Sequence, residues 1–160
     1  MERGESFLAG AHGIAARAHR RAVRAIRQAF PELVVKDLEV VTLFLDPAAG
    51  DAVVIDLKKP KDRLLKTVFE NSLPVKIEGQ SARIPDLEMA AALKFAAMVG
   101  VYRAMPDKMQ DAADFARIVA AHPRLRVERL MRLAGLVYAG GGSEVRRLVE
   151  SVRQGKPLVF

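Results

Sequence analysis

Hydrophobic positions follow two different periods along this chain, and the changes of period mark the predicted elements. A spacing of three and four residues predicts amphipathic helices, whereas short runs rich in valine, leucine and isoleucine between turn residues predict strands. Helices are predicted over about 13–30, 61–70, 86–101, 107–121, 127–138 and 143–154, and strands over 38–45, 52–57, 75–77 and 82–84.

The order of these elements predicts an α+β fold that forms a single compact unit in two parts. Residues 1–85 are expected to hold a small mixed or antiparallel sheet, and residues 86–160 a C-terminal helical bundle packed on it. The absence of cysteine excludes disulfides, thiolate zinc sites and thiol catalysis. The apolar run 89–101 is too short to span a bilayer, and the chain does not begin like a signal peptide, so we expect a cytoplasmic protein with no membrane partner.

Charge is distributed unevenly along the chain. The formal net charge is +7, and the segment from Ala9 to Pro31 holds five arginines and no acidic residue. On the predicted first helix these arginines cluster opposite the apolar residues. Such a face suits RNA, a nucleotide or an acidic protein, although it can equally be only solvated. The arginines are Arg17, Arg20, Arg21, Arg24 and Arg27.

A single lysine interrupts the longest apolar run. From Met89 to Val101 every residue is apolar or small except Lys94. An ammonium group is costly to bury unless an acidic group pairs with it. Lys94 therefore either points into a cleft as a phosphate ligand or extends its ammonium to water at the edge of the bundle.

The segment after Pro106 offers partners for that lysine. Lys108, Asp111 and Asp114 follow one another at intervals of three residues. Asp111 borders the apolar stripe of its helix, so we expect it to face Lys94 across the helix pair and hold the ammonium in place. The alternative is a solvated face with weak local ion pairs.

Two further features have the residue types of a nucleotide site. Asp56 lies near the end of a strand, where a carboxylate can hold a divalent metal or accept a proton, or can simply alternate toward solvent. Gly10 and Gly13 lie at the start of the predicted first helix and could cradle a phosphate at its N-terminus, although they match no P-loop or dinucleotide motif. No serine or histidine pattern indicates a hydrolase triad.

Taken in order, four segments resemble one protein family. They are GAHG at 10–13, VVTLFLDPAAGDAVVIDLKKP at 40–60, IPDLEMAAALKFAAM at 84–98 and DKMQDAADF at 107–115. The set resembles the bacterial nucleotidyltransferase-like proteins grouped with abortive-infection toxin nucleotidyltransferases of the AbiEii/AbiGii type. The resemblance implies a small sheet of nucleotidyltransferase type flanked by helices, and a link to toxin–antitoxin systems.

The resemblance also implies an activity, the transfer of a nucleotidyl group from an NTP to a protein or to RNA such as tRNA, with Mg²⁺ or Mn²⁺. Asp56 then matches a metal-binding carboxylate. Lys94 matches the basic residue after the IPDLE segment, and Asp111, rather than Asp114, matches the late acid. Gly10, Gly13, Lys94 and Lys108 are the candidate nucleotide-binding residues.

One departure from the family separates the hypotheses. The family has a strand with paired acids about ten residues after its glycine-rich turn, whereas this chain has the arginine-rich helix and no acid before Glu32. Either the metal pair is lost, which we favour, or Asp37 and Glu39 replace it. The chain is accordingly a nucleotidyltransferase, an inactive relative that binds a nucleotide, RNA or an acidic partner, or a subunit that forms a homodimer through an exposed sheet edge.

Overall fold

A computed structural model describes residues 4–59, 61–101 and 103–160, with the side chains of the first helix described from Arg17 onward. The chain divides into two compact units, Met1–Lys61 and Asp62–Phe160. The first is called the N-terminal unit and the second the C-terminal unit, and each is described by itself.

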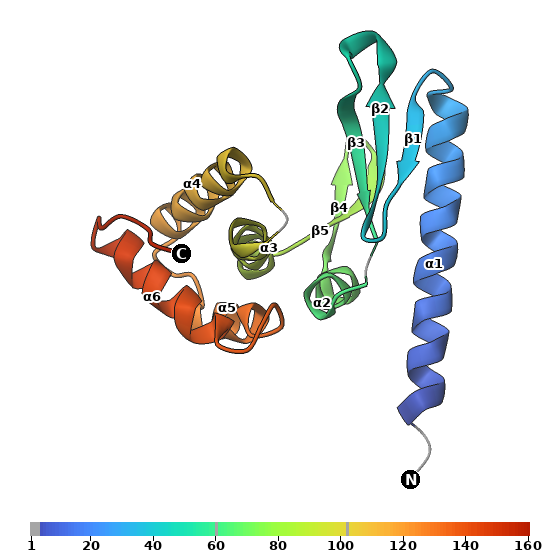
Figure 1. Cartoon of the computed structure of the whole chain (residues 1–160). Coiled ribbons are helices and arrows are strands. Elements are labelled where there is room, and N and C mark those ends of the chain that lie inside the picture. The colour runs from blue at the N-terminus through green and yellow to red at the C-terminus, as the bar shows by residue number, and fades with distance from the viewer. Residues whose placement is uncertain (1–3, 60, 102) are drawn as a thin grey trace. The chain divides into compact units, whose positions relative to one another are not determined.

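The N-terminal unit combines one long helix with a three-stranded antiparallel sheet in the order β1-β2-β3 (Figure 1). A short 3₁₀ turn joins β2 to β3, where the Asp46 carboxylate accepts a hydrogen bond from the Ala48 backbone N–H at 2.9 Å and Gly50 closes the turn with a φ of 66°. The elements are α1 (Gly4–Ala29), β1 (Val34–Asp37), β2 (Val41–Asp46) and β3 (Ala52–Lys58).

Strand register separates the two faces of this sheet. Thr42 pairs with Asp37 and Leu57, and its hydroxyl bonds to His19 of α1, so these residues lie on the face that carries the helix. Asp56 pairs with Leu43 in the adjacent register and therefore lies on the opposite face. The sheet thus keeps Asp56 away from the arginine-bearing helix.

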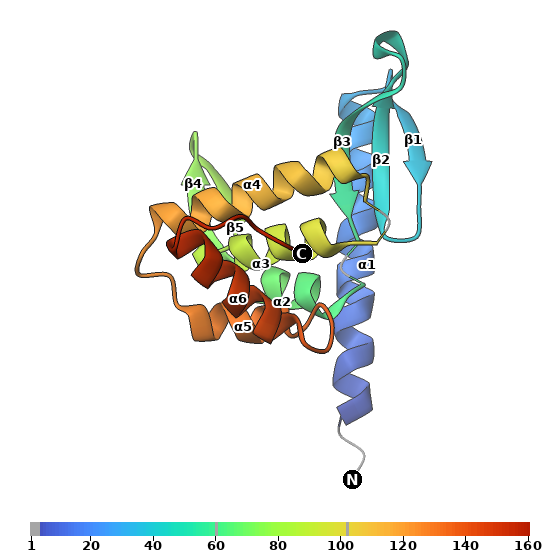
Figure 2. The same cartoon turned by 60° about the vertical axis from the view of Figure 1, so that its left-hand side comes forward.

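The C-terminal unit begins with a helix and a two-stranded antiparallel hairpin and continues as four helices (Figure 2). Asp62 caps its first helix by accepting the Leu65 N–H at 2.7 Å, and Asp86 caps α3 by accepting the Met89 N–H at 3.0 Å. The elements are α2 (Arg63–Asn71), β4 (Leu73–Ile77), β5 (Gln80–Ile84), α3 (Leu87–Val99), α4 (Met105–Ala121), α5 (Val127–Ala134) and α6 (Gly141–Arg153).

A closed hydrophobic core stabilises the C-terminal unit. Phe95 of α3 and Phe115 of α4 are fully buried, and Leu64 and Val68 of α2 pack into the same cluster. Fully burying side chains of this size stabilises a fold by about 1.5–3 kcal/mol each. Because α2 shares this core, the boundary between the units falls at residue 61 and not at the predicted residue 85.

The connection between α5 and α6 depends on close backbone contact. Gly140 has a φ of 97°, and a Cβ on Gly141 would lie 2.4 Å from the Ala134 carbonyl oxygen. Within this connection, Tyr138 stacks on Phe95 with ring centroids 6.0 Å apart. The Tyr138 hydroxyl donates to the Glu144 carboxylate, and burial, followed by this hydrogen bond, raises the pKa of Tyr138 to about 12.

The α+β class and the antiparallel sheets agree with the sequence prediction, and three local predictions need correction. The first helix begins at Gly4, not near residue 13, and strand β1 was not predicted because it is a four-residue run. The last helix begins at Gly141 with Gly140 as its cap, so Ser143 lies inside it. In the described part of the chain, no helix is long and apolar enough to cross a membrane.

Candidate functional site

Two separate groups of charged residues are candidates for function, and the first surrounds Lys94. Its ammonium lies 3.0 Å from Asp111 Oδ1 and 2.7 Å from Asp114 Oδ2, so it joins α3 to α4. The expectation that Asp111 faces Lys94 across the helix pair is confirmed. Asp114 accepts hydrogen bonds from Gln110 and Arg117 and also shares the lysine.

Asp111 is more deeply buried than the residues that surround it in this group. The Asp111 side chain is only 5% exposed, and the Arg103 Nε lies 2.6 Å from its second oxygen. That N–H is not aligned for a hydrogen bond, so Asp111 Oδ2 is buried without a hydrogen-bond partner among the described residues. Ion pairing with Arg103 and Lys94 therefore compensates the buried charge.

The Lys94 ammonium is held by carboxylates. Its hydrogen bond with Asp114 is the leading reason why the pKa of Lys94 is raised and that of Asp114 is lowered. Both groups stay ionised across the neutral range, so the two negative charges offset the positive charge that a phosphate would need. Lys108, the candidate nucleotide ligand one turn before Asp111, has no ion pair with the described residues. The nucleotide roles of Lys94, Lys108 and Asp111 stay predictions.

Sequence reasoning missed a second ion pair in the same unit, in which only the carboxylate is buried. Glu88, in the first turn of α3, accepts hydrogen bonds from the Arg126 guanidinium and from the Arg126 backbone N–H at 3.1 Å. The bond from the Arg126 side chain is the main reason that the pKa of Glu88 is lowered. The only sequence signal was an acid in the first turn of an apolar helix, which helix capping alone would explain.

Asp56 does not have the surroundings of a metal ligand. Its side chain is 48% exposed, and its carboxylate lies 3.0 Å from the Lys58 ammonium on the same strand. Neighbours Ile55 and Leu57 are half-buried, which matches the alternation considered as the simpler explanation. A cation next to a lone exposed carboxylate disfavours Mg²⁺ or Mn²⁺, which need several oxygen ligands.

The other acids do not complete a metal site. Asp37 is bound by Lys59 at 2.8 Å, and Glu39, which is 84% exposed, lies 3.7 Å from Lys61. Across the described residues, no group of three or more histidines, cysteines, aspartates or glutamates could hold a metal ion. The residues present therefore do not fit the metal centre that the family resemblance implies.

The predicted phosphate cradle at Gly10 and Gly13 needs the same kind of correction. Both glycines lie inside α1, which begins at Gly4. Beyond the first four residues of a helix, backbone N–H groups bond to carbonyls four residues back. These N–H groups are thus not presented as a loop around an anion.

The second group of charges is the arginine face of α1. All five arginines are exposed, and at 3.6 residues per turn they fall within an arc of about 120°. Ten residues separate the first from the last, a length of about 15 Å. Among the side chains that the structure describes, no ion pair neutralises Arg20, Arg21, Arg24 or Arg27. This face therefore presents a strong positive field to solvent.

A groove of ≈ 590 Å³ lies beside this face, within the N-terminal unit. Arg20, Arg24 and Arg27 line it from α1, and Val35, Asp37 and Thr42 line it from the sheet. His19, Val23 and Gln28 complete the lining. The groove thus combines three guanidinium groups, two valines and one carboxylate.

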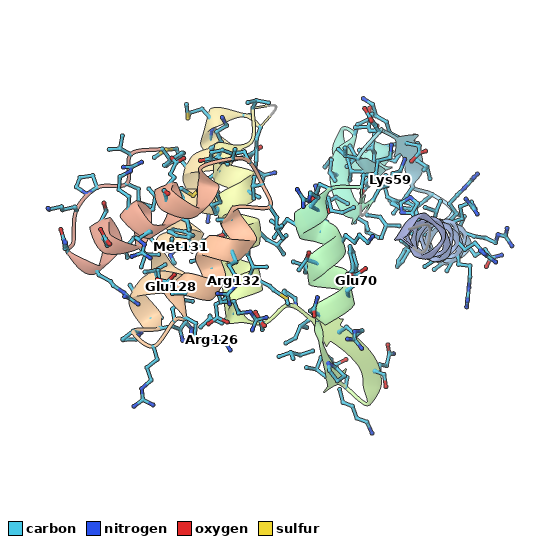
Figure 3. All side chains as sticks on the ribbon, turned by 90° about the horizontal axis from the view of Figure 1, so that it is seen from below. Lys59, Glu70, Arg126, Glu128, Met131 and Arg132 are labelled. Atoms are coloured by element: carbon cyan, nitrogen blue, oxygen red, sulfur yellow. The ribbon has the colours of Figure 1, made fainter. Side chains whose placement is uncertain are left out.

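Four polar side chains are linked at the wall of this groove. The Thr42 hydroxyl donates to Asp37 Oδ1 and lies 2.9 Å from His19 Nε2. Because the Thr42 hydrogen is used on Asp37, His19 must donate through Nε2, which assigns its tautomer. Lys59, labelled in Figure 3, adds its ammonium to Asp37 Oδ1 at 2.8 Å and also donates to the Leu38 carbonyl at 2.6 Å.

The protonation states of His19 and Asp37 follow from their surroundings in this hydrogen-bonded group. Burial and the nearby Lys59 ammonium lower the pKa of His19, and Asp37 opposes them only in part. The hydrogen bond from Lys59, followed by that from Thr42, lowers the pKa of Asp37. At neutral pH the groove therefore holds a neutral imidazole and an ionised carboxylate.

A smaller hollow of ≈ 340 Å³ lies between α5 and the start of α6. Glu128, Met131 and Arg132 line it, and Figure 3 shows them along α5. Glu128 is already paired with Arg146 at 2.6 Å. This hollow offers no cluster of reactive or ligating groups among the described residues, so the groove beside α1 is the stronger candidate site.

Comparison with family models, with curated proteins and with solved structures finds no match to this chain. The resemblance to nucleotidyltransferases, the toxin–antitoxin link and the homodimer therefore stay predictions.

Proposed function

We propose that this protein is a nucleic-acid-binding module that holds the phosphate backbone of RNA on helix α1. The observation that carries the proposal is the row of five exposed arginines beside a groove that three of them line. This develops the second hypothesis from the sequence, an inactive relative that binds a nucleotide, RNA or an acidic partner.

The residue types favour phosphate as the ligand. Every basic residue between Ala9 and Pro31 other than the two histidines is arginine, and none is lysine. A guanidinium group presents planar, paired donors that match a phosphate in two hydrogen bonds, whereas an ammonium acts as a point charge. Contact with several phosphates along about 15 Å of helix suits a regularly charged polymer better than a single nucleotide.

An acidic protein is the competing partner for the same face. Its carboxylates would also pair with arginine, but an irregular protein surface rarely repeats charge at each turn of a helix. The regular spacing of Arg17, Arg20, Arg24 and Arg27, at steps of three and four residues, supports the repeating charge of a nucleic acid.

The test is a binding titration of the full chain with a labelled single-stranded RNA over a range of salt concentrations. We expect the logarithm of the association constant to fall linearly with the logarithm of salt, with a slope of about −0.7 for each phosphate neutralised. The triple variant Arg20→Gln, Arg24→Gln, Arg27→Gln should reduce the steepness of that slope by about two units.

A matched control removes the same charge from the other unit. Arg124, Arg132 and Lys156 are exposed, and the triple change of these residues to glutamine should leave both affinity and slope near those of the wild type. Equal losses in the two triple variants would indicate only nonspecific charge and would contradict the proposal. Salt-independent binding, or binding of acidic protein but not RNA, would also contradict it.

Transfer of a nucleotidyl group remains the alternative that the family resemblance implies. The groups around Asp56 do not fit the metal that this reaction needs. Incubation of the full chain with each of the four labelled NTPs and Mg²⁺ or Mn²⁺ tests this alternative. A labelled RNA or protein product that disappears in Asp56→Asn would replace the binding module with an enzyme.

A further inference from the structure

An exposed carboxylate lies in a groove whose other charges are positive. Asp37 faces the groove that Arg20, Arg24 and Arg27 line, and its side chain is 66% exposed. A carboxylate there repels phosphate, and more strongly where solvent is displaced. The Lys59 ammonium already pairs with one oxygen of this carboxylate, so the part of Asp37 that faces the ligand is better matched by a hydrogen-bond donor than by a phosphate.

The structure fixes the orientation of this carboxylate. Thr42 and Lys59 both donate to Oδ1, and His19 holds Thr42 in turn. Oδ2 accepts no hydrogen bond from the described residues, so it remains as an acceptor at the surface of the groove. An acceptor that is already oriented loses little conformational freedom when a ligand donates to it.

The ligand must therefore carry a hydrogen-bond donor close to its phosphates. A ribose hydroxyl meets this requirement, because each 2′-hydroxyl in RNA lies next to the phosphodiester backbone and can donate. Carboxylates bind ribose hydroxyls in this way in dinucleotide-binding proteins. The amino groups of bases are also donors, but DNA carries them as well. A comparison of RNA with DNA therefore distinguishes a ribose hydroxyl from a base amino group as the donor.

We infer that Asp37 recognises the ribose of the bound strand while Arg20, Arg24 and Arg27 hold its phosphates, so that the groove selects RNA over DNA. This inference rests on the proposed function. The inference adds to the proposed function a substrate class, RNA and not DNA, and names Asp37 as the residue that determines this preference. Val23 and Val35 add apolar surface to the lining of the groove.

The first experiment compares labelled RNA, DNA and 2′-O-methyl RNA of the same sequence on the wild-type full chain. A hydrogen bond to a charged group predicts about tenfold tighter binding of RNA than of DNA. The 2′-O-methyl strand keeps the ribose but loses its hydroxyl donor, so it should bind as weakly as DNA. Equal binding of RNA and 2′-O-methyl RNA overturns the inference without any change to the protein.

The second experiment uses Asp37→Asn, in which the amide oxygen can still accept from Thr42. The preference for RNA should fall to near one, because both strands gain from the loss of the negative charge but only RNA loses a hydrogen bond. Glu39→Gln is the matched control, since it removes the same charge two residues away from an 84% exposed side chain outside the groove lining. It should keep the wild-type preference.

The outcomes distinguish failure of the ribose contact from failure of the proposed function. If RNA and DNA bind equally and with the expected salt slope, the proposed function stands and the ribose contact is wrong. If Asp37→Asn weakens both strands by one factor, the carboxylate contacts a base or only maintains the fold, and the inference is again overturned. If neither strand binds, the proposed function itself fails.

Discussion

The two units of this protein use their charged residues in opposite ways. In the C-terminal unit, Lys94 and Arg126 are paired with carboxylates that are almost completely buried in the helical bundle. In the N-terminal unit, the arginines of α1 point to solvent beside an open groove. Charges that are already neutralised within a fold contribute to its specificity, whereas exposed charges of one sign are available to a ligand.

The two units also differ in how many hydrophobic side chains they bury. Among the described residues, Val41 and Phe44 are the only buried hydrophobic side chains of the N-terminal unit, and all others belong to the C-terminal unit. Because burial of apolar area is the main source of stability, hydrophobic burial stabilises the C-terminal unit more than the N-terminal unit. Substitutions in this unit should therefore change stability, and substitutions on α1 should change binding.

The largest expected effect comes from the core. Phe95→Ala should lower the free energy of unfolding by about 3–5 kcal/mol, since Phe95 is completely buried in the closed cluster. Phe44→Ala is the matched change in the N-terminal unit and should cost less, because few of its neighbours are buried and the site can collapse. Urea denaturation followed by circular dichroism measures both, and a larger loss for Phe44→Ala would reverse the comparison of the two cores.

The next effect concerns the ion pairs between α3 and α4. Lys94→Met keeps the apolar stem but leaves Asp111 and Asp114 without their shared cation, so unfolding should become easier by about 1–3 kcal/mol. Lys108→Met makes the same change one turn from Asp111 and should stay within about 0.5 kcal/mol. The midpoints of urea denaturation of the two variants and the wild type measure these changes in stability. Equal effects of the two variants would show that Lys94 has no special structural role.

The smallest effect is a pH dependence from His19. Because its pKa is lowered in the folded state, the unfolded chain takes up a proton first as the pH falls. The stabilisation is fully present above the unfolded value of about 6.5 and is lost as the pH falls through the lower folded pKa. The wild-type free energy of unfolding should thus decrease from about pH 7.5 to about pH 5.

His19→Gln provides the comparison for that titration, because its amide can still donate to Thr42 but does not titrate. The variant should lose part of the wild-type pH dependence. Identical dependence in the two proteins, measured by urea denaturation at each pH, would mean that other groups account for it.

The ion pair between Lys94 and Asp111 could be predicted from sequence, because helical periodicity and the cost of a buried charge lead to the same conclusion. Arg103 could not, since it lies between the two helices, where no periodicity applies. The pairing of Glu88 with Arg126 joins residues 38 positions apart, so no local pattern indicates it.

Even less of the groove could be predicted from the sequence. Its walls come from α1 and from strands β1 and β2, and the length of α1 was underestimated. The arginine face itself was predicted, because it depends only on helical spacing. The place of Asp37 beside it depends on strand register, which β1 sets and which the sequence did not reveal.

The stacking of Tyr138 on Phe95 makes the C-terminal unit visible by itself in spectroscopy. The chain has no tryptophan and two tyrosines, Tyr102 and Tyr138, both of which lie beyond residue 61. Near-ultraviolet circular dichroism and tyrosine emission therefore report this unit, and the N-terminal unit contributes only the weak bands of phenylalanine. One denaturation recorded in the near and the far ultraviolet can thus show whether the two units unfold together or in sequence.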